Sequence, residues 1–251
     1  MFTDHPHIIN YYGYEENVDS RGNIMHNIFL EYASCGSIAD QIEQSVENTG
    51  GGLSEWEVRN YVKGVLLGLK DIHKQGFVHC DIKPDNILLV DGYVPKICDF
   101  GLAIKMGLVS HLRGTPAYFA PETIKYRIYT ASADIWALGC SVLEMVTGRC
   151  AWGVPVTEEN MSCIGNYEIV PQIPKGLSWE IQDFLKSCLV RNFGDRWNAE
   201  SLLSHPFLQD PFQPISIAVG PKTWRTQSTM LPNEDQKKKS NLCSFMKELA
   251  I

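Results

Sequence analysis

The stretch His79-Cys80-Asp81-Ile82-Lys83-Pro84-Asp85-Asn86 decides the fold of this chain of 251 residues. It places a carboxylate at position 81, an ammonium two residues later and an amide at position 86. Phosphoryl transfer uses these side-chain types: an acceptor for a hydroxyl proton, a cation for phosphate oxygens and a neutral oxygen ligand for Mg²⁺. Taken alone, the octet is also compatible with an ordinary polar loop.

A predicted hairpin follows the octet. Its strands are expected at Asn86 to Val90 and at Tyr93 to Cys98, joined by the turn residues Asp91-Gly92. Because a hairpin brings its two ends together, Asp99 is expected beside Asn86. Two hard oxygen donors at one place predict a Mg²⁺ site.

Asp99 begins the triplet Asp99-Phe100-Gly101. A lone triplet of this kind is usually a turn, but its pairing with the octet favours a functional site. Phe100 is expected to anchor the segment in apolar surroundings, and Gly101 permits a flexible backbone.

Helical patterns dominate the rest of the chain. The clearest helix begins at a capping box made by Ser54 and Glu57 and ends before Gly76. Three glycines, Gly50 to Gly52, precede it. They are interpreted as a linker rather than a phosphate-binding loop, because no strand leads into them and no Gly-Lys-Ser/Thr follows. Other predicted elements are strands at Ile8 to Tyr14 and His26 to Tyr32, and helices at Ser37 to Val46, Ala133 to Thr147, Thr157 to Ile164, Trp179 to Val190 and Ala199 to Leu203, with an irregular stretch after Cys98.

Bulk properties exclude several classes. The formal charge of −7 argues against a nucleic-acid partner. The eight cysteines show neither CxxC spacing nor a zinc-site pattern, the N-terminus does not resemble a signal peptide, and no run of 18 apolar residues would cross a membrane. These features predict an intracellular protein, cytoplasmic with the nucleus also open, that has neither nucleic-acid nor membrane partners. They leave its oligomeric state open.

Three motifs stand in the order typical of protein kinases: HxDxKxxN at 79–86, Asp-Phe-Gly at 99–101 and Ala-Pro-Glu at 120–122. The chain therefore resembles a eukaryotic-type serine/threonine protein kinase catalytic domain over about residues 1–208. The resemblance implies an α+β, protein kinase-like fold, with a mainly α-helical large lobe at 32–208 and a partial β-stranded small lobe at 1–31. Residues 209–251 are expected to be a largely disordered tail, with a docking helix around Leu242 to Leu249 as the alternative.

The resemblance also implies roles for side chains. Asp81 matches the catalytic base, Lys83 the residue that touches the transferred phosphate, and Asn86 and Asp99 the Mg²⁺ ligands. Thr115, in Gly114-Thr115-Pro116, is expected close to the acceptor site, and with Lys83 it indicates the serine/threonine class.

Structural roles follow in the same way. Asp134 is expected to support the catalytic loop from a buried helix, with His79, Phe100 and Gly101 framing the site and Glu122 pairing with Arg196. Phe29 to Ala33 resembles the adenine-binding hinge, with Leu30 as gatekeeper. Contacts to ATP are expected from Leu30, Glu31, Ala33, Ser37, Lys83, Asn86 and Asp99.

Two departures from the family pattern stand out. Cys80 occupies the place usually held by an arginine that pairs with a phosphate on the segment from Asp99 to Glu122. The only hydroxyl side chains in that segment are Ser110, Thr115 and Tyr118. Ser110 is the best regulatory candidate, with a plain exposed serine as the alternative. Activity is expected not to depend strongly on phosphorylation of the segment.

Cys98 is interpreted as a packed thiol, the alternative being a thiol that reacts with electrophiles.

The second departure is an incomplete small lobe. No lysine precedes Lys63 and no GxGxxG precedes Gly50, so the family's Gly-rich loop and ATP-contacting lysine are not found, and the chain is expected to be an N-terminally truncated copy. Loss of one such donor lowers rates roughly 10²- to 10³-fold. The expected function is ATP- and Mg²⁺-dependent phosphorylation of protein Ser/Thr in a MAP kinase-type cascade, acting on a MAP kinase kinase, since the chain resembles plant MEKK-like MAP kinase kinase kinases. The alternative is a catalytically impaired, non-catalytic protein-interaction module.

Overall fold

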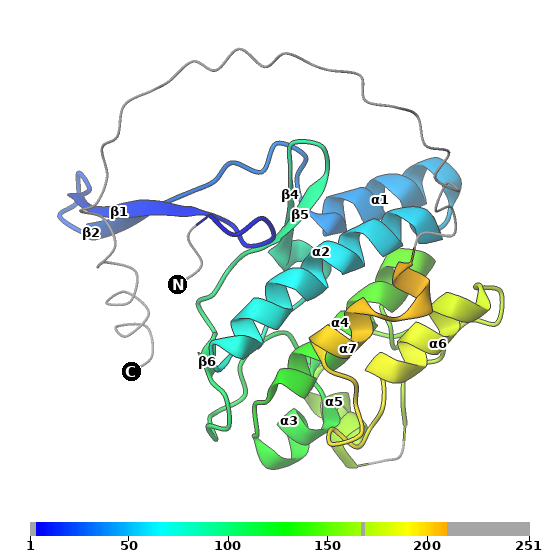
Figure 1. The fold of residues 1–251 in the computed structure, drawn as a ribbon. Helices are drawn as coiled ribbons and strands as arrows, with labels where there is room; N and C mark the ends of the chain where they lie inside the picture. The colour runs from blue at the N-terminus through cyan, green and yellow to red at the C-terminus, as the bar shows by residue number, and fades with distance from the viewer. Residues whose placement is uncertain (1–3, 167–168, 210–251) are drawn as a thin grey trace, which may run out of the picture. The chain divides into compact units, whose positions relative to one another are not determined.

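Two long helices form the centre of the helical part in the computed structural model, which describes residues 4–166 and 169–209 (Figure 1). Helix α2, Glu55–Lys74, begins at the predicted capping box, in which Ser54 and Glu57 each accept a hydrogen bond from the other's backbone amide. Helix α4, Ala131–Thr147, ends at Gly148 in the left-handed conformation. Both predicted helices are confirmed, because their apolar residues recur at helical spacing and are buried.

Shorter helices surround this pair. Helix α2 contacts α4 and α7, and α4 also contacts α6. The bounds are α1 Ile38–Thr49, α3 Pro121–Tyr126, α5 Glu158–Asn166, α6 Trp179–Cys188 and α7 Ala199–Leu203. The described residues up to Leu208 pack as one compact unit.

The strands form three separate two-stranded antiparallel sheets in the described part of the chain. Strands β4, Ile87–Val90, and β5, Val94–Ile97, make the predicted hairpin, with Ile87 opposite Ile97. Strands β3, Phe77–Val78, and β6, Ile104–Lys105, pair with each other. Strands β1, Tyr11–Val18, and β2, Ile24–Leu30, pair near the N-terminus.

Several bounds differ from the prediction. Strand β2 spans Ile24–Leu30, where the predicted strand ran from His26 to Tyr32, and β1 continues to Val18 rather than ending at Tyr14. The first strand begins at Tyr11, because Ile8 instead bridges to Ile97 and Ile9 donates its amide to the Ile97 carbonyl. The stretch after Cys98 is not wholly irregular, because it contains β6 and α3. Strand β6 is two residues long and pairs with a strand far away in the sequence, so no local pattern indicates it.

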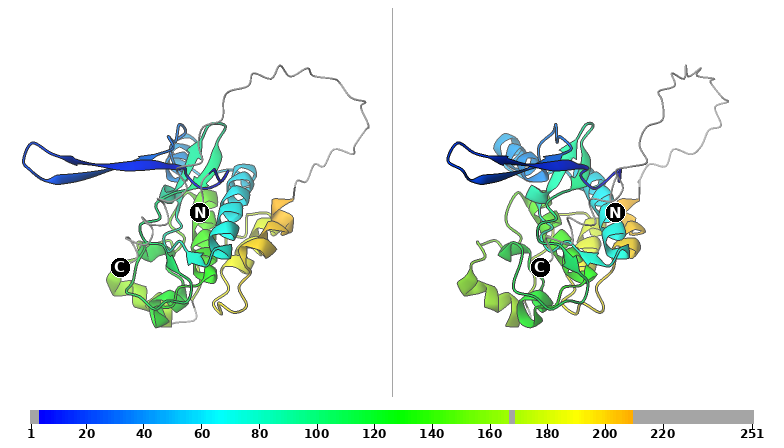
Figure 2. Two further views of the ribbon diagram at one scale, coloured as in Figure 1. Left: turned by 60° about the vertical axis from the view of Figure 1, so that its left-hand side comes forward. Right: turned by 90° about the vertical axis from the view of Figure 1, so that its left-hand side faces the viewer.

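The β1–β2 hairpin projects away from the helices (Figure 2). Its cross-strand neighbours include Tyr14 opposite Ile28 and Val18 opposite Ile24. All four side chains are exposed, Val18 to 69% and Ile24 to 62%. The hairpin therefore presents unpacked apolar side chains to solvent.

The proposed division into lobes at residue 31 stays a prediction, and the predicted tail from 210 onward lies outside the described residues. Within those residues, no helix has both the length and the apolar character needed to cross a bilayer.

Candidate active site

Asp81 is the most highly connected side chain of the octet. It is buried, and its Oδ1 accepts hydrogen bonds from the backbone amide of Thr115 at 2.9 Å and from the Thr115 hydroxyl at 2.8 Å. Its Oδ2 accepts from the side-chain amide of Asn86 at 2.8 Å and lies 3.2 Å from Lys83 Nζ. Lys83 Nζ also donates to the Thr115 hydroxyl at 2.8 Å. The structure thus brings these four predicted residues together, and we call Asp81, Lys83, Asn86 and Thr115 the Asp81 group.

His79 holds the backbone of Asp81 in place through hydrogen bonds of its ring. Its Nδ1 accepts the Asp81 backbone amide, so the proton lies on Nε2, which donates to the Cys98 carbonyl at 2.9 Å. Burial lowers the pKa of His79 and keeps the ring neutral. Phe100 packs edge-to-face on the ring, with 4.9 Å between the centroids. A neutral histidine with one defined tautomer therefore fixes the backbone of Asp81.

Asp134 of α4 holds the start of the loop. Its carboxylate accepts the backbone amides of His79 at 2.9 Å and Cys80 at 3.0 Å, and also contacts His73 Nε2 at 2.8 Å. Cys80 has a φ of 72°, which is strained for a residue with a side chain. The buried carboxylate holds this strained turn in place, as the resemblance implied for Asp134.

Asn86 and Asp99 lie at the two ends of the β4–β5 hairpin. The Cys98 amide donates to the Asn86 carbonyl at 3.0 Å, which places Asp99 one residue away from the partner of Asn86. Asp99 Oδ1 accepts the Gly101 amide, and the side chain of Asp99 is exposed. In the described part of the chain, no hydrogen bond reaches Asp99 Oδ2 or Asn86 Oδ1. These two oxygens fit the hard-donor chemistry of Mg²⁺.

The hinge offers two unused backbone groups. The Glu31 amide donates to the Asn10 carbonyl, but the Glu31 carbonyl and the Ala33 amide make no hydrogen bond with other described residues. One acceptor and one donor, two residues apart on the hinge, fit the hydrogen-bonding edge of adenine. Leu30, the predicted gatekeeper, ends β2 beside them and is 44% exposed.

Ser37 is differently employed. Its hydroxyl accepts the Asp40 amide and donates to the Asp40 carboxylate, so it caps α1. Ser37, predicted among the contacts to ATP and also as the start of this helix, is a helix cap in this structure, and its role toward a nucleotide stays a prediction.

Glu31 and Lys96 form an ion pair that sequence reasoning missed. Lys96 Nζ donates to both Glu31 oxygens, at 2.8 and 2.7 Å, and Glu31 Oε2 also accepts the Asn10 amide at 3.1 Å. Lys96 lies on β5 and is buried. A lysine between Pro95 and Ile97 in a short apolar strand was the available signal, but its partner lies 65 residues away.

The predicted pair of Glu122 and Arg196 is present. Both guanidinium nitrogens Nη1 and Nη2 donate to the carboxylate, at 2.7 and 3.1 Å, and both side chains are buried. Arg196 also stacks over Trp136, with 5.0 Å from Cζ to the ring centroid. The pair ties α3 to the segment before α7.

A second missed contact joins the segment before α3 to α4. The Tyr118 hydroxyl donates to Glu144 Oε2 at 2.5 Å. Burial, with the neighbouring carboxylate, raises the pKa of Tyr118, and burial also raises the pKa of Glu144. The hydroxyl therefore remains protonated and available as the donor.

Cys98 is buried, and burial raises the pKa of its thiol to about 12. A thiol in this state is a poor nucleophile. The geometry is that of the packed thiol in the sequence interpretation.

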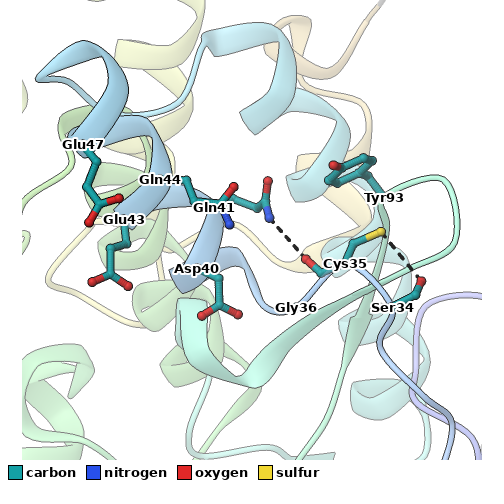
Figure 3. Close-up of a pocket in the computed structure, with 9 residues that line it drawn as sticks. All are labelled: Ser34, Cys35, Gly36, Asp40, Gln41, Glu43, Gln44, Glu47 and Tyr93. Carbon is teal, nitrogen blue, oxygen red and sulfur yellow. Dashed lines mark hydrogen bonds between the residues drawn. The ribbon is translucent and has the colours of Figure 1, made fainter.

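A polar pocket lies just past the hinge (Figure 3). Gln41 donates to the Cys35 carbonyl at 3.2 Å, and three carboxylates of α1 line the same pocket. None of the residues of the Asp81 group lines it. Its lining is Ser34, Cys35, Gly36, Asp40, Gln41, Glu43, Gln44, Glu47 and Tyr93.

Together, the fold and the Asp81 group define a protein kinase catalytic domain. The chain belongs to the protein kinase domain family, whose model matches residues 2–208. Members of this family use ATP and Mg²⁺ in general, and the oxygens of Asn86 and Asp99 fit that chemistry.

The relatives narrow the resemblance. The chain is 45% identical to mitogen-activated protein kinase kinase kinase 20 of Arabidopsis thaliana, over 82% of this chain and 62% of that protein. It is 38% identical to mitogen-activated protein kinase kinase kinase 17 of the same plant, over 81% of this chain and 55% of that protein. The chain therefore spans little more than half the length of these relatives. The similarity to plant MAP kinase kinase kinases expected from the sequence is confirmed.

Proposed function

We propose that this protein transfers the γ-phosphoryl group of ATP to serine or threonine hydroxyls of a protein, and that the protein acts in a MAP kinase-type cascade on a MAP kinase kinase. The observation that carries the proposal is the Asp81 carboxylate, held by Thr115, Asn86 and Lys83. The names of the similar plant proteins support the cascade. A location inside the cell, in the cytoplasm or nucleus, is part of the same proposal.

The residues present divide the work. Asp81 would orient the acceptor hydroxyl and take its proton, and Lys83 would contact the transferred phosphate from its place between Asp81 and Thr115. Asn86 and Asp99 would hold Mg²⁺, which neutralises charge on the phosphates. The Glu31 carbonyl and the Ala33 amide would bind the adenine edge.

The hydrogen bonds between Thr115 and Asp81 explain the proposed Ser/Thr preference. They bring the Gly114-Thr115-Pro116 segment against the catalytic carboxylate at 2.8 to 2.9 Å. A short acceptor side chain would reach Asp81 beside this segment, whereas a phenol places its hydroxyl farther from the backbone.

The test is a phosphoryl-transfer assay with Mg·ATP and a MAP kinase kinase as acceptor, comparing the chain with Asp81→Asn and with Asp71→Asn as the matched control. We expect the rate of transfer to be low, because no lysine precedes Lys63 and the family's ATP-contacting lysine is therefore not found. The rate should fall at least 10²-fold further in Asp81→Asn and stay unchanged in the control.

Transfer that survives Asp81→Asn would overturn the assignment of the base. If neither transfer nor Mg·ATP binding is detected by calorimetry while a partner protein still binds, the non-catalytic interaction module is the correct function.

A further inference from the structure

Arg113 has a guanidinium group without an anion. Its Nη2 donates to the Ser110 hydroxyl at 2.9 Å and its Nη1 to the Leu102 carbonyl at 3.4 Å. Its Nε is buried and has no partner in the described part of the chain. Among those residues, no carboxylate lies within ion-pair distance of it. A partly buried cation with an unused donor is a ready partner for a negative group.

The backbone of Arg113 is fixed independently of Ser110. Its amide donates to the Tyr129 hydroxyl at 2.9 Å, and that hydroxyl donates to the His111 carbonyl at 2.9 Å. Tyr129 is buried just before α4. The backbone that carries the guanidinium is therefore held at this position without help from the hydroxyl of Ser110.

Charge around Ser110 is one-sided. The sequence holds no carboxylate between Asp99 and Glu122, whereas Lys105 and Arg113 lie in that interval. Glu122 is neutralised by Arg196. The Ser110 amide donates to the carbonyl of Arg127, which brings the backbone of a further cationic residue next to it. The local field favours an anion at position 110.

The catalytic loop supplies no cation here. The Cys80 thiol donates to the Val78 carbonyl and packs against the apolar cluster of Val78, Ile104 and Tyr129. Burial raises the pKa of the Cys80 thiol, so it stays uncharged. The only guanidinium in contact with the Ser110 hydroxyl, among the described residues, is that of Arg113.

We propose that Ser110 is a phosphorylation site and that Arg113 binds its phosphate, in place of the catalytic-loop arginine that Cys80 replaces. ATP, used by a protein kinase, is the donor. The Ser110 oxygen bonds to the γ-phosphorus as the bond to the β,γ-bridging oxygen breaks, ADP leaves, and the hydroxyl proton passes to that kinase's base. Neighbouring Val109 is 72% exposed and His111 is exposed, so another kinase can reach the segment. The proposal concerns where the phosphate binds, and the expectation that activity does not depend strongly on phosphorylation of the segment stays a prediction.

The test incorporates phosphoserine at position 110 during synthesis and follows the ³¹P NMR shift with pH. Phosphoserine has a second pKa of about 6, and a guanidinium at hydrogen-bond distance lowers such a pKa by roughly one unit or more. We expect that decrease in the folded protein, its loss on unfolding in urea, and its loss in Arg113→Gln. Arg127→Gln is the matched control and should keep the decrease.

Arg113→Lys guards against a folding defect, because it keeps the charge but not the planar donor set, and should keep part of the decrease. A phosphoserine that titrates the same in folded and unfolded protein would overturn the proposal. So would a decrease that survives Arg113→Gln but not Arg127→Gln. The readout needs no catalysis, so failure of the proposed function leaves this result interpretable.

Discussion

At the scale of residues, the site is organised by charges that already have partners. Asp81 uses both oxygens within the protein, His79 is neutral with a defined tautomer, and Glu31 is paired with Lys96. Such prior organisation reduces the reorientation that a reaction would otherwise require.

Lys96→Met tests how much the ion pair between Lys96 and Glu31 stabilises the protein. It leaves the Glu31 carboxylate with only the Asn10 amide, and we expect the free energy of unfolding in urea to fall by about 1–3 kcal/mol. Nucleotide affinity, measured by calorimetry, should fall as well, because the carbonyl of Glu31 belongs to the hinge. Lys96→Met combined with Glu31→Gln should recover part of the loss. Strictly additive single effects would show that the two side chains are not coupled.

Stability should decline in mild acid because of His79. Burial lowers its pKa in the folded state below the ordinary value of 6.5, so the unfolded chain binds the proton first as the pH falls. The free energy of unfolding should therefore decrease below about pH 6.5, by up to about 1.4 kcal/mol per pH unit, and be unaffected by this group above about pH 7.5.

Urea titrations between pH 5 and 8 measure that slope. Burial also lowers the pKa of His7, so His79→Gln should remove one part of the slope and His7→Gln another. A slope that is unchanged in the double variant would rule out both histidines as its source.

The residues of the three motifs could be predicted from the sequence, because their order and spacing are specific. Lys96, Arg113 and the Tyr118–Glu144 pair could not. Each acts through a partner brought near by the fold, and no local pattern of residues records such a partner. Ser37 is a different case: the helix that begins after it was predicted and Ser37 caps it, whereas its predicted contact with ATP is not tested by the structure.

At the scale of elements, the segment between β6 and α3 touches the catalytic loop through a glycine. Gly114 has a φ of 108°, and a Cβ built there would lie 2.3 Å from the Cys80 carbonyl oxygen. Only a residue without a side chain permits this approach. The approach in turn allows Thr115 to reach Asp81.

Gly114→Ala should separate the two segments. We expect at least a tenfold loss of phosphoryl transfer and a decrease of about 1–3 kcal/mol in the free energy of unfolding, with the helical circular dichroism retained. Gly107→Ala is the matched control, because Gly107 also has a positive φ, 81°, but its Cβ would meet nothing within 4 Å. Equal effects of the two substitutions would attribute the loss to backbone strain alone.

The helices were predictable at this scale because capping residues and apolar spacing agree, as at Ser54 and Glu57. Short strands were not, because β3 and β6 have two residues each and are stabilised by pairing across the fold.

At the scale of the whole molecule, the β1–β2 hairpin leaves most of its residues exposed. Ile24→Thr with Ile28→Thr keeps β-branched side chains while removing exposed apolar surface. We expect the self-associated fraction in sedimentation velocity to fall about twofold or more. Val154→Thr, at an exposed valine outside the hairpin, is the control. A fall of the same size in the control would mean that self-association does not occur through the hairpin.

The attachment of that hairpin has a consequence for hydrogen exchange. It is joined to strand β5 through Ile9 with Ile97 and through Glu31 with Lys96, while its ladder bonds are internal. Its amides should therefore take up deuterium through local opening, whereas those in the centres of α2 and α4 wait for global unfolding. Two levels of amide protection, rather than one melting temperature, would then describe the local and global opening of this chain.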